Sequence, residues 1–209
     1  MTVLLYTNVM LLGHYTREGG CIMSHDKIRK LTLAGLFAAM AFICFFYLRI
    51  EIPMGLGLTG KLYIGYAFVI LASVLLGGTY GALSGAVGLT LADLLTGYVT
   101  SAPPTFVAKF ILGWSITCIA FSILHLDRVH SIKKEVLYVI IAAIGGCIIN
   151  VITEPIIRYA FKYYFLGYAQ EVAYVSAINC GISMAVNSVP SVIIAAILYR
   201  VMKPLVQKN

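Results

Sequence analysis

The sequence predicts an all-α integral membrane protein, a six-transmembrane-helix bundle with both termini in the cytoplasm. Hydrophobic residues make up 61% of the 209 residues and charged residues only 11%, against roughly 45–50% and about 25% in soluble domains. The mean hydropathy is +0.95. The apolar residues form successive runs, and because one span needs about 20 residues, the chain has room for about six. We expect residues 23–209 to form one membrane domain.

The first three predicted spans cover residues 31–50, 62–76 and 77–95. A basic leader, residues 24–30, precedes the first span, as is usual for a cytoplasmic flank. The second span is short and runs directly into the third, which begins with Gly77, Gly81 and Gly85. Glycines four residues apart share one helical face and let another backbone approach closely. We therefore expect this face to pack inside the bundle.

The last three predicted spans cover residues 105–126, 136–160 and 175–200. Nine Lys and Arg residues flank the spans on one side of the membrane: Lys27, Arg29, Lys30, Arg128, Lys133, Lys134, Arg200, Lys203 and Lys208. Five lie on or near the other side: Arg49, Lys61, Lys109, Arg158 and Lys162. The excess of basic flanks marks the cytoplasmic side. Both termini are therefore expected inside, and residues 51–61, 96–104 and 161–174 outside.

Residues 1–22 differ from the rest of the chain. Their short apolar patch lacks a basic leader and is interrupted by Arg17 and Glu18, which is not the pattern of a secretory signal peptide. The segment Glu18-Gly19-Gly20 can be encoded by a purine-rich ribosome-binding site that precedes a second start at Met23. We expect the native protein to be bacterial and to begin at Met23, with residues 1–22 as an upstream extension.

Several soluble functions are disfavoured by the sequence. Residues 55–61 resemble a glycine-rich nucleotide loop, but Leu62 stands where the magnesium-binding Ser or Thr of a P-loop belongs. The histidines and cysteines lack the spacing of a metal site, so we expect no metal and no cofactor. The net charge of +7 reflects topology rather than a nucleic-acid partner. An intramembrane aspartyl protease would need two aspartates inside the bilayer, and only Asp93 qualifies. The spans also lack a nucleophile and a base that face each other, so we expect no catalysis.

Polar residues within the spans are the main functional signal, because ionisable groups in a bilayer are costly unless paired or hydrated. The predicted topology places them together in the outer half of the bundle. They are Asp93 at the end of the third span, Lys109 at the start of the fourth, Asn150, Glu154 and Arg158 on one face of the fifth, and Asn179, Ser183 and Asn187 on one face of the sixth.

Two interpretations of these residues remain open. They form structural salt bridges, Asp93 with Lys109 and Glu154 with Arg158, or they line a water-accessible cavity that opens outward. The amide residues at the same depth favour a cavity. Four aromatic residues predicted at that level, Tyr63, Tyr66, Tyr98 and Phe106, are suited to stacking on a flat ligand.

A second small-residue stripe lies on the first span. Ala34, Ala38 and Ala41 share one face near the cytoplasmic end, directly after the basic leader. Such a face packs inside the bundle or docks a partner protein, and the residues alone leave both alternatives open.

Three segments together resemble a known family: LTLAGLFAAMAF, LLGGTYGALSGAVGLTLADLLTGY and PPTFVAKFILGW. They are similar to substrate-binding (S) components of energy-coupling factor (ECF) vitamin transporters, in the riboflavin-type group. The resemblance implies a six-helix bundle in the bacterial cell membrane that binds one vitamin near the outer face. It also implies that Ala34-xxx-Ala38 docks on a transmembrane coupling protein driven by two ABC-type ATPases, and that the S component topples to release vitamin inside.

The resulting candidate site contains Asp93, Tyr98, Lys109, Asn150, Glu154, Arg158 and Asn179. Acid, base, amide and aromatic groups suit a small polar heteroaromatic vitamin, and we favour pyridoxine or the hydroxymethylpyrimidine precursor of thiamine. Riboflavin, pantothenate and a cobalamin-type ligand remain open. The alternative function is an autonomous proton-coupled transporter with Asp93 and Glu154 as the relay, although the sequence shows no inverted repeat.

Overall fold

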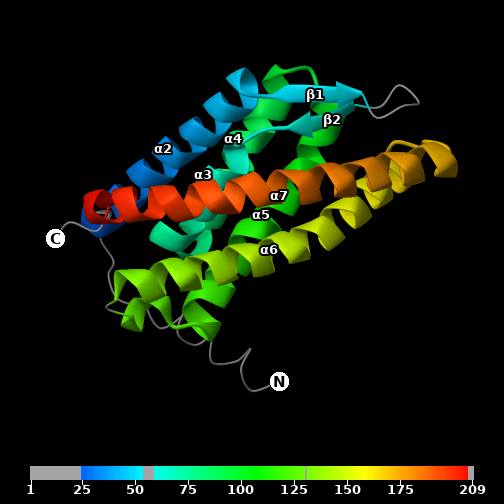
Figure 1. The fold of residues 1–209 in the computed structure, drawn as a ribbon. Coiled ribbons are helices and arrows are strands. Elements are labelled where there is room, and N and C mark those ends of the chain that lie inside the picture. The colour runs from blue at the N-terminus through cyan, green and yellow to red at the C-terminus, as the bar shows by residue number, and fades with distance from the viewer. Residues whose placement is uncertain (1–24, 54–58, 130, 207–209) are drawn as a thin grey trace, which may run out of the picture.

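The described part of the chain folds into long helices that run side by side, with one short β-hairpin (Figure 1). The computed structural model describes residues 25–53, 59–129 and 131–206. The predicted upstream extension of residues 1–22, the start at Met23, residues 55–58 of the outer loop and Lys208 lie outside these ranges.

The elements follow one another as α2 (His25–Tyr47), β1 (Ile50–Pro53), β2 (Thr59–Leu62), α3 (Gly65–Leu75), α4 (Gly78–Leu95), the 3-10 turn η1 (Val99–Ser101) and α5 (Ala102–Thr117). The second half contains the π-helical turn η2 (Cys118–Ile123), η3 (Leu126–Arg128), α6 (Ile132–Ala160), the π-helical turn η4 (Phe161–Phe165) and α7 (Gln170–Val206). Each of the six predicted spans corresponds to one α-helix.

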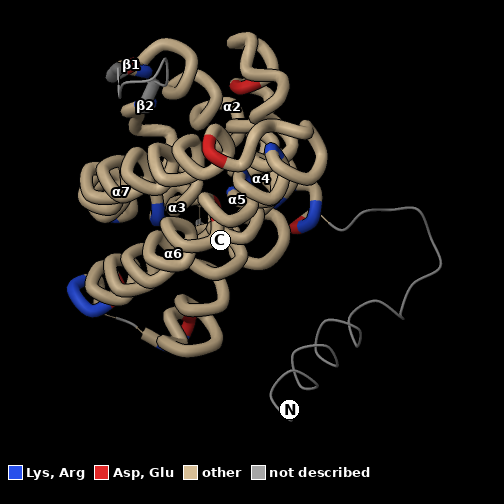
Figure 2. The backbone as a smooth tube through the Cα atoms, turned by 90° about the vertical axis from the view of Figure 1, so that its right-hand side faces the viewer, with Lys and Arg blue, Asp and Glu red and all other residues tan. Residues whose placement is uncertain are grey.

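Among the described residues, four helical segments are long and apolar enough to cross a membrane: His25–Tyr47, Val99–Ile123, Ile132–Phe165 and Gln170–Val206. Helix α3 has 11 residues, and at about 1.5 Å per residue it covers only about half of a bilayer core. All of its residues are buried, because α2, α4, α5 and α7 surround it. Most of the helical backbone carries no charged side chain (Figure 2), as expected for helices in contact with lipid.

The connection after α2 is an antiparallel hairpin rather than an irregular loop. Residues Ile50 and Glu51 of β1 pair with Leu62 and Lys61 of β2. Asn187 of α7 holds the end of this hairpin, because its Nδ2 donates to the Lys61 carbonyl at 2.6 Å and its Oδ1 accepts from the Tyr63 amide at 2.9 Å. Asn187 therefore supports the backbone of β2.

The expected internal packing of the glycine face is confirmed. Gly77 and Gly78 have φ of 64° and 53°, a left-handed conformation that glycine adopts without strain, and they turn the chain sharply from α3 into α4. A Cβ atom at Gly81 would lie 2.6 Å from the Ala72 carbonyl oxygen of α3, and one at Gly88 would lie 2.4 Å from the Ala38 carbonyl oxygen of α2. These glycines let α4 touch the backbones of both neighbours.

The alanine stripe of α2 lies on the side of that helix that packs against α4. Ala34 and Ala41 are buried, and Ser84 of α4 donates to the Ala34 carbonyl at 2.8 Å. Ala38 is partly exposed. On the opposite side of α2, Gly35 and Ala39 are exposed, and a Cβ atom at Gly35 would have no neighbour within 4 Å. In this conformation the predicted docking stripe therefore lies inside the bundle, with Ala34 and Ala38 against α4 and Ala41 beside Gly65 of α3.

The start of α2 and the end of α7 lie at one end of the bundle (Figure 1), where the Arg29 guanidinium donates to the Val206 carbonyl. The hairpin and the connection between α6 and α7 lie at the opposite ends of these helices (Figure 1). This arrangement separates the two ends of the described chain from the loops predicted to face outward.

Candidate functional site

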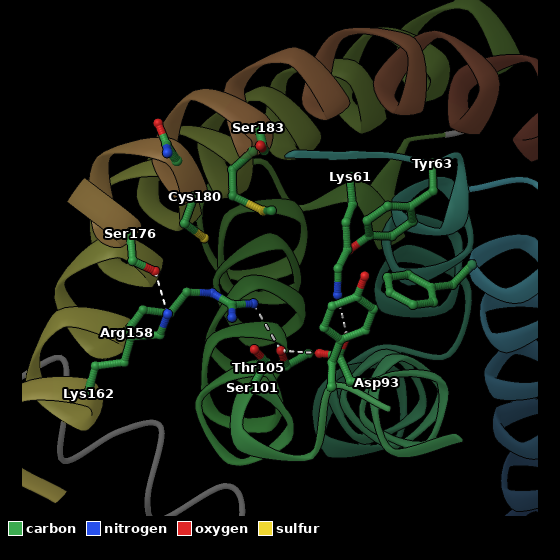
Figure 3. Close-up of a pocket in the computed structure, with 14 residues that line it drawn as sticks. Lys61, Tyr63, Asp93, Ser101, Thr105, Arg158, Lys162, Ser176, Cys180 and Ser183 are labelled. Carbon is green, nitrogen blue, oxygen red and sulfur yellow. Dashed lines mark hydrogen bonds and ion pairs between the residues drawn. The ribbon is translucent and has the colours of Figure 1, made fainter. Parts of the chain in front are cut away.

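A cavity of about 250 Å³ lies beside the hairpin, between α4, α5, α6 and α7 (Figure 3). Its charged lining consists of Lys61, Asp93, Arg158 and Lys162. Helix α7 contributes a polar face with Ser176, Asn179 and Ser183, and aromatic walls come from Phe45, Tyr63 and Tyr98. The cavity thus combines hydrogen-bonding groups with ring surfaces.

A chain of polar contacts crosses the cavity from β2 to α6. Lys61 Nζ lies 3.1 Å from Asp93 Oδ1, and Thr105 Oγ1 donates to Asp93 Oδ2 at 2.6 Å. Arg158 Nη2 donates to Thr105 Oγ1 at 3.0 Å and to Glu154 Oε1 at 2.9 Å. The single hydroxyl of Thr105 therefore accepts from a cation and donates to an anion, which fixes the separation of Arg158 and Asp93 (Figure 3).

Of the two interpretations, the one that pairs Asp93 with Lys109 as a salt bridge is wrong. Asp93 pairs with Lys61, whereas Lys109 pairs with Glu154 and also donates to the Tyr66 hydroxyl. Tertiary structure decides this pairing, because the hairpin places Lys61 over the end of α4 and Lys109 faces α6. The i, i+4 pair of Glu154 with Arg158, which that interpretation also contained, is present at 2.9 Å, but Glu154 is shared between two cations.

The sequence-predicted site residues separate into two layers. Asp93, Tyr98, Arg158 and Asn179 line the cavity. The second layer lies behind the lining and is fully or almost fully buried, with Lys109 and Glu154 at 0% and Asn150 at 2% exposure. Asn150 Nδ2 donates to Glu154 Oε2 at 3.2 Å. Because Glu154 holds Arg158, this second layer positions a cavity residue.

The expected aromatic set is also divided. Tyr63 and Tyr98 line the cavity. Tyr66 is buried and donates to the sulfur of Met184, so its ring supports the second layer. Phe106 is 37% exposed and is not part of the lining. Phe45 contributes an aromatic wall instead, with its ring centroid 4.6 Å from that of Tyr63.

Tyr98 joins the η1 connection to the hairpin. Its hydroxyl donates to Glu51 Oε1 at 2.7 Å, and Lys61 Nζ lies 3.2 Å from its ring centroid. Burial lowers the pKa of Lys61 below its usual value, and the charge of Asp93 opposes that change. Tyr98 and Lys61 together close one side of the cavity.

Two charged residues of the cavity lining, Lys61 and Lys162, are missing from the predicted set. Lys162 continues the fifth-span stripe at the same spacing, one step beyond Arg158, so the stripe itself contained the signal. The sequence places Lys61 in the outer loop of residues 51–61, whereas the structure places it in β2, opposite Glu51. The alternation of apolar and polar residues in Ile50-Glu51-Ile52 is the signal that favours a strand there.

The family model of the ECF-type riboflavin transporter, S component, matches residues 25–204. The chain belongs to this family. It is therefore a subunit of a membrane transporter, in a family of transporter subunits rather than enzymes, and the resemblance seen in the sequence is confirmed. A search of curated protein sequences finds no match.

The fold agrees with this assignment. The S component matches a solved structure described as "Structure and mechanism of the S component of a bacterial ECF transporter", with a TM-score of 0.55 and 23% identity. The match covers 87% of this chain and 99% of that chain. At this identity the likeness establishes a shared fold, and the identity of the ligand has to be argued from the cavity.

Proposed function

We propose that this S component binds one small vitamin in the cavity beside the hairpin and delivers it inward together with an ECF module. The observation that supports this most is the polar cavity itself. Several charged and amide groups converge on about 250 Å³ of space within an otherwise apolar bundle, and such groups are costly there unless they serve a ligand or each other.

We infer that all six helices belong to the membrane domain and that both termini are cytoplasmic. The proximity of the start of α2 to the end of α7 supports placing them on one side. The basic residues around those ends and in the connection between α5 and α6 support the cytoplasm as that side. The cavity then opens on the outer face of a bacterial cell membrane.

The ligand we propose is a small polar heteroaromatic vitamin, with pyridoxine and hydroxymethylpyrimidine as first candidates. The cavity volume of about 250 Å³ lies just below the range of roughly 300–1,000 Å³ that is typical of ligand pockets, which favours a small ligand. Tyr63, Tyr98 and Phe45 offer ring faces. Riboflavin, for which the family is described, is the principal alternative, followed by pantothenate and a cobalamin-type ligand.

For docking, we propose that a transmembrane coupling protein, driven by two ABC-type ATPases, contacts the exposed face of α2. Ala34, Ala38 and Ala41 were expected to form this contact. Because Ala34 and Ala41 are buried, the proposed first contact is at Gly35 and Ala39 on the exposed side of the same helix.

This assignment gives a test with a matched control. Ala39→Trp should abolish uptake into cells that contain the whole ECF module and leave vitamin binding by the purified chain unchanged. Ala34→Trp should lower the thermal stability and the vitamin affinity as well, because it places a large ring between α2 and α4. Normal uptake by Ala39→Trp would remove this face from the interface.

Uptake also tests the proposed function as a whole. We expect cells that express this chain to accumulate labelled vitamin only when the coupling protein and the ATPases are present. A proton relay through Asp93 and Glu154 would require their ion pairs with Lys61, Lys109 and Arg158 to break. Uptake by this chain alone that a protonophore abolishes would replace our proposal with the autonomous transporter.

A further inference from the structure

The charges around the cavity do not balance. Its lining carries three cations, Lys61, Arg158 and Lys162, and one carboxylate, Asp93. The pair of Lys109 and Glu154 behind the lining adds one charge of each sign. The site therefore holds four cations and two carboxylates.

The excess positive charge lies on the α6 side of the cavity. Lys61 is neutralised by Asp93 on the opposite side, and Glu154 is shared by Lys109 and Arg158. Lys162 makes no ion pair within the described residues. Its Nζ donates to Ser176 Oγ at 2.6 Å.

The same side presents hydrogen-bond donors toward the cavity. Arg158 uses Nε and Nη2 to hold Glu154 and Thr105, and its Nη1 makes no hydrogen bond within the described part of the chain. Figure 3 shows the guanidinium reaching into the cavity, with Lys162 and Ser176 beside it. Asn179, whose side-chain amide is a further potential donor, also lines the cavity on α7.

This combination is selective for negative charge. Guanidinium and ammonium groups bind carboxylate and phosphate oxygens through charge-assisted hydrogen bonds. A cleft with an excess of one sign and apolar walls focuses its field on ligands of the opposite sign. A neutral ligand would leave two positive charges of this cavity uncompensated.

We propose that the transported molecule carries a carboxylate or phosphate group and that this group binds between Arg158 and Lys162. The remainder of the molecule then extends toward Asp93, Lys61 and the ring of Tyr98. This inference rests on the proposed function, since it names the chemistry of the ligand for the same cavity. Within that function it favours a vitamin that carries a carboxylate or phosphate over pyridoxine and hydroxymethylpyrimidine, which carry neither group.

Matched ligand pairs test the proposal by titration calorimetry on the purified full chain. The probes are pyridoxal 5′-phosphate with pyridoxal, riboflavin 5′-phosphate with riboflavin, nicotinate with nicotinamide, and pantothenate with pantothenol. The first two pairs report phosphate and the last two carboxylate. We expect the charged member of at least one pair to bind about tenfold more tightly than its neutral partner or better, and we expect added salt to reduce this ratio.

Variants of Lys162 locate the charged contact. Lys162→Gln should remove the preference for the charged member, and Lys162→Arg should retain most of it, because the positive charge is kept. Lys134→Gln, at the exposed opposite end of α6, is the matched control and should leave every affinity unchanged. If Lys162→Gln does not fold, the inference is tested by the affinity ratio of the charged and neutral members in Lys162→Arg and by the salt dependence of this ratio in the unmodified chain.

The outcomes are distinguishable. Equal or tighter binding of the neutral members overturns this inference and leaves the proposed function intact. The same holds if Lys162→Gln weakens both members of a pair equally. If no probe binds but pyridoxine or hydroxymethylpyrimidine does, this inference is overturned and the proposed function stands. If those two vitamins also fail to bind, the proposed function is overturned, and this inference with it.

Discussion

The buried pair of Lys109 and Glu154 allows a stabilising role to be separated from ligand binding. Both side chains have 0% exposure, and removing one partner of a buried ion pair costs roughly 3–5 kcal/mol. For Lys109→Met we expect the lower end, about 3 kcal/mol, because Glu154 keeps Arg158 at 2.9 Å. In a chain of this length, that loss lowers the melting temperature by roughly 6–12 °C.

Thermal unfolding of the purified, ligand-free protein in one detergent measures this loss. Lys134→Met, which changes an exposed lysine of α6, is the control and should not alter the melting temperature. The double variant Lys109→Met with Glu154→Gln should be more stable than the sum of the single losses predicts, since it leaves no unpaired carboxylate. An unchanged melting temperature together with a large loss of vitamin affinity would refute this reasoning, because Lys109 would then be a ligand contact.

Two further variants test other parts of the account. Asp93→Asn should weaken vitamin binding by about tenfold or more. The loss of stability should be small, since its partner Lys61 is partly exposed. Unchanged affinity with a lower melting temperature would show that the ion pair of Asp93 and Lys61 is purely structural. Gly88→Ala should lower the melting temperature, because its Cβ would lie 2.4 Å from the Ala38 carbonyl oxygen. Gly35→Ala is the control and should leave the melting temperature unchanged, because Gly35 has open space. Equal effects in the two variants would argue against the close contact of α2 and α4.

The helices are the part of the fold that the sequence predicts best. Long apolar runs determine their positions, so the third predicted span, residues 77–95, agrees with Gly78–Leu95 to within one residue. The sixth was predicted to end at residue 200 and continues to Val206. Proline usually ends helices in soluble proteins, but Pro190 and Pro204 both lie inside α7, as is tolerated in membrane helices.

The sequence predicts many of the polar residues of the site but only some of their ion pairs. The depth of a residue in the membrane and the spacing of residues on a helical face both follow from regular helix geometry. These two quantities were enough to predict that Asp93, Arg158 and Asn179 lie around one cavity. The partner of Asp93 depends on where the β-hairpin folds, and hydropathy contains no information on that position. A strand pairing between Glu51 and Lys61 therefore decided a contact that helix geometry alone assigned to Lys109.

The central claim is that the cavity beside the hairpin holds a vitamin. Native mass spectrometry of the chain purified in mild detergent, compared with Arg158→Gln, tests it most directly. We expect the unmodified chain to retain one small molecule of vitamin mass and Arg158→Gln to lose it while remaining folded. An unmodified chain that carries no ligand and takes up none from a vitamin panel would contradict the account.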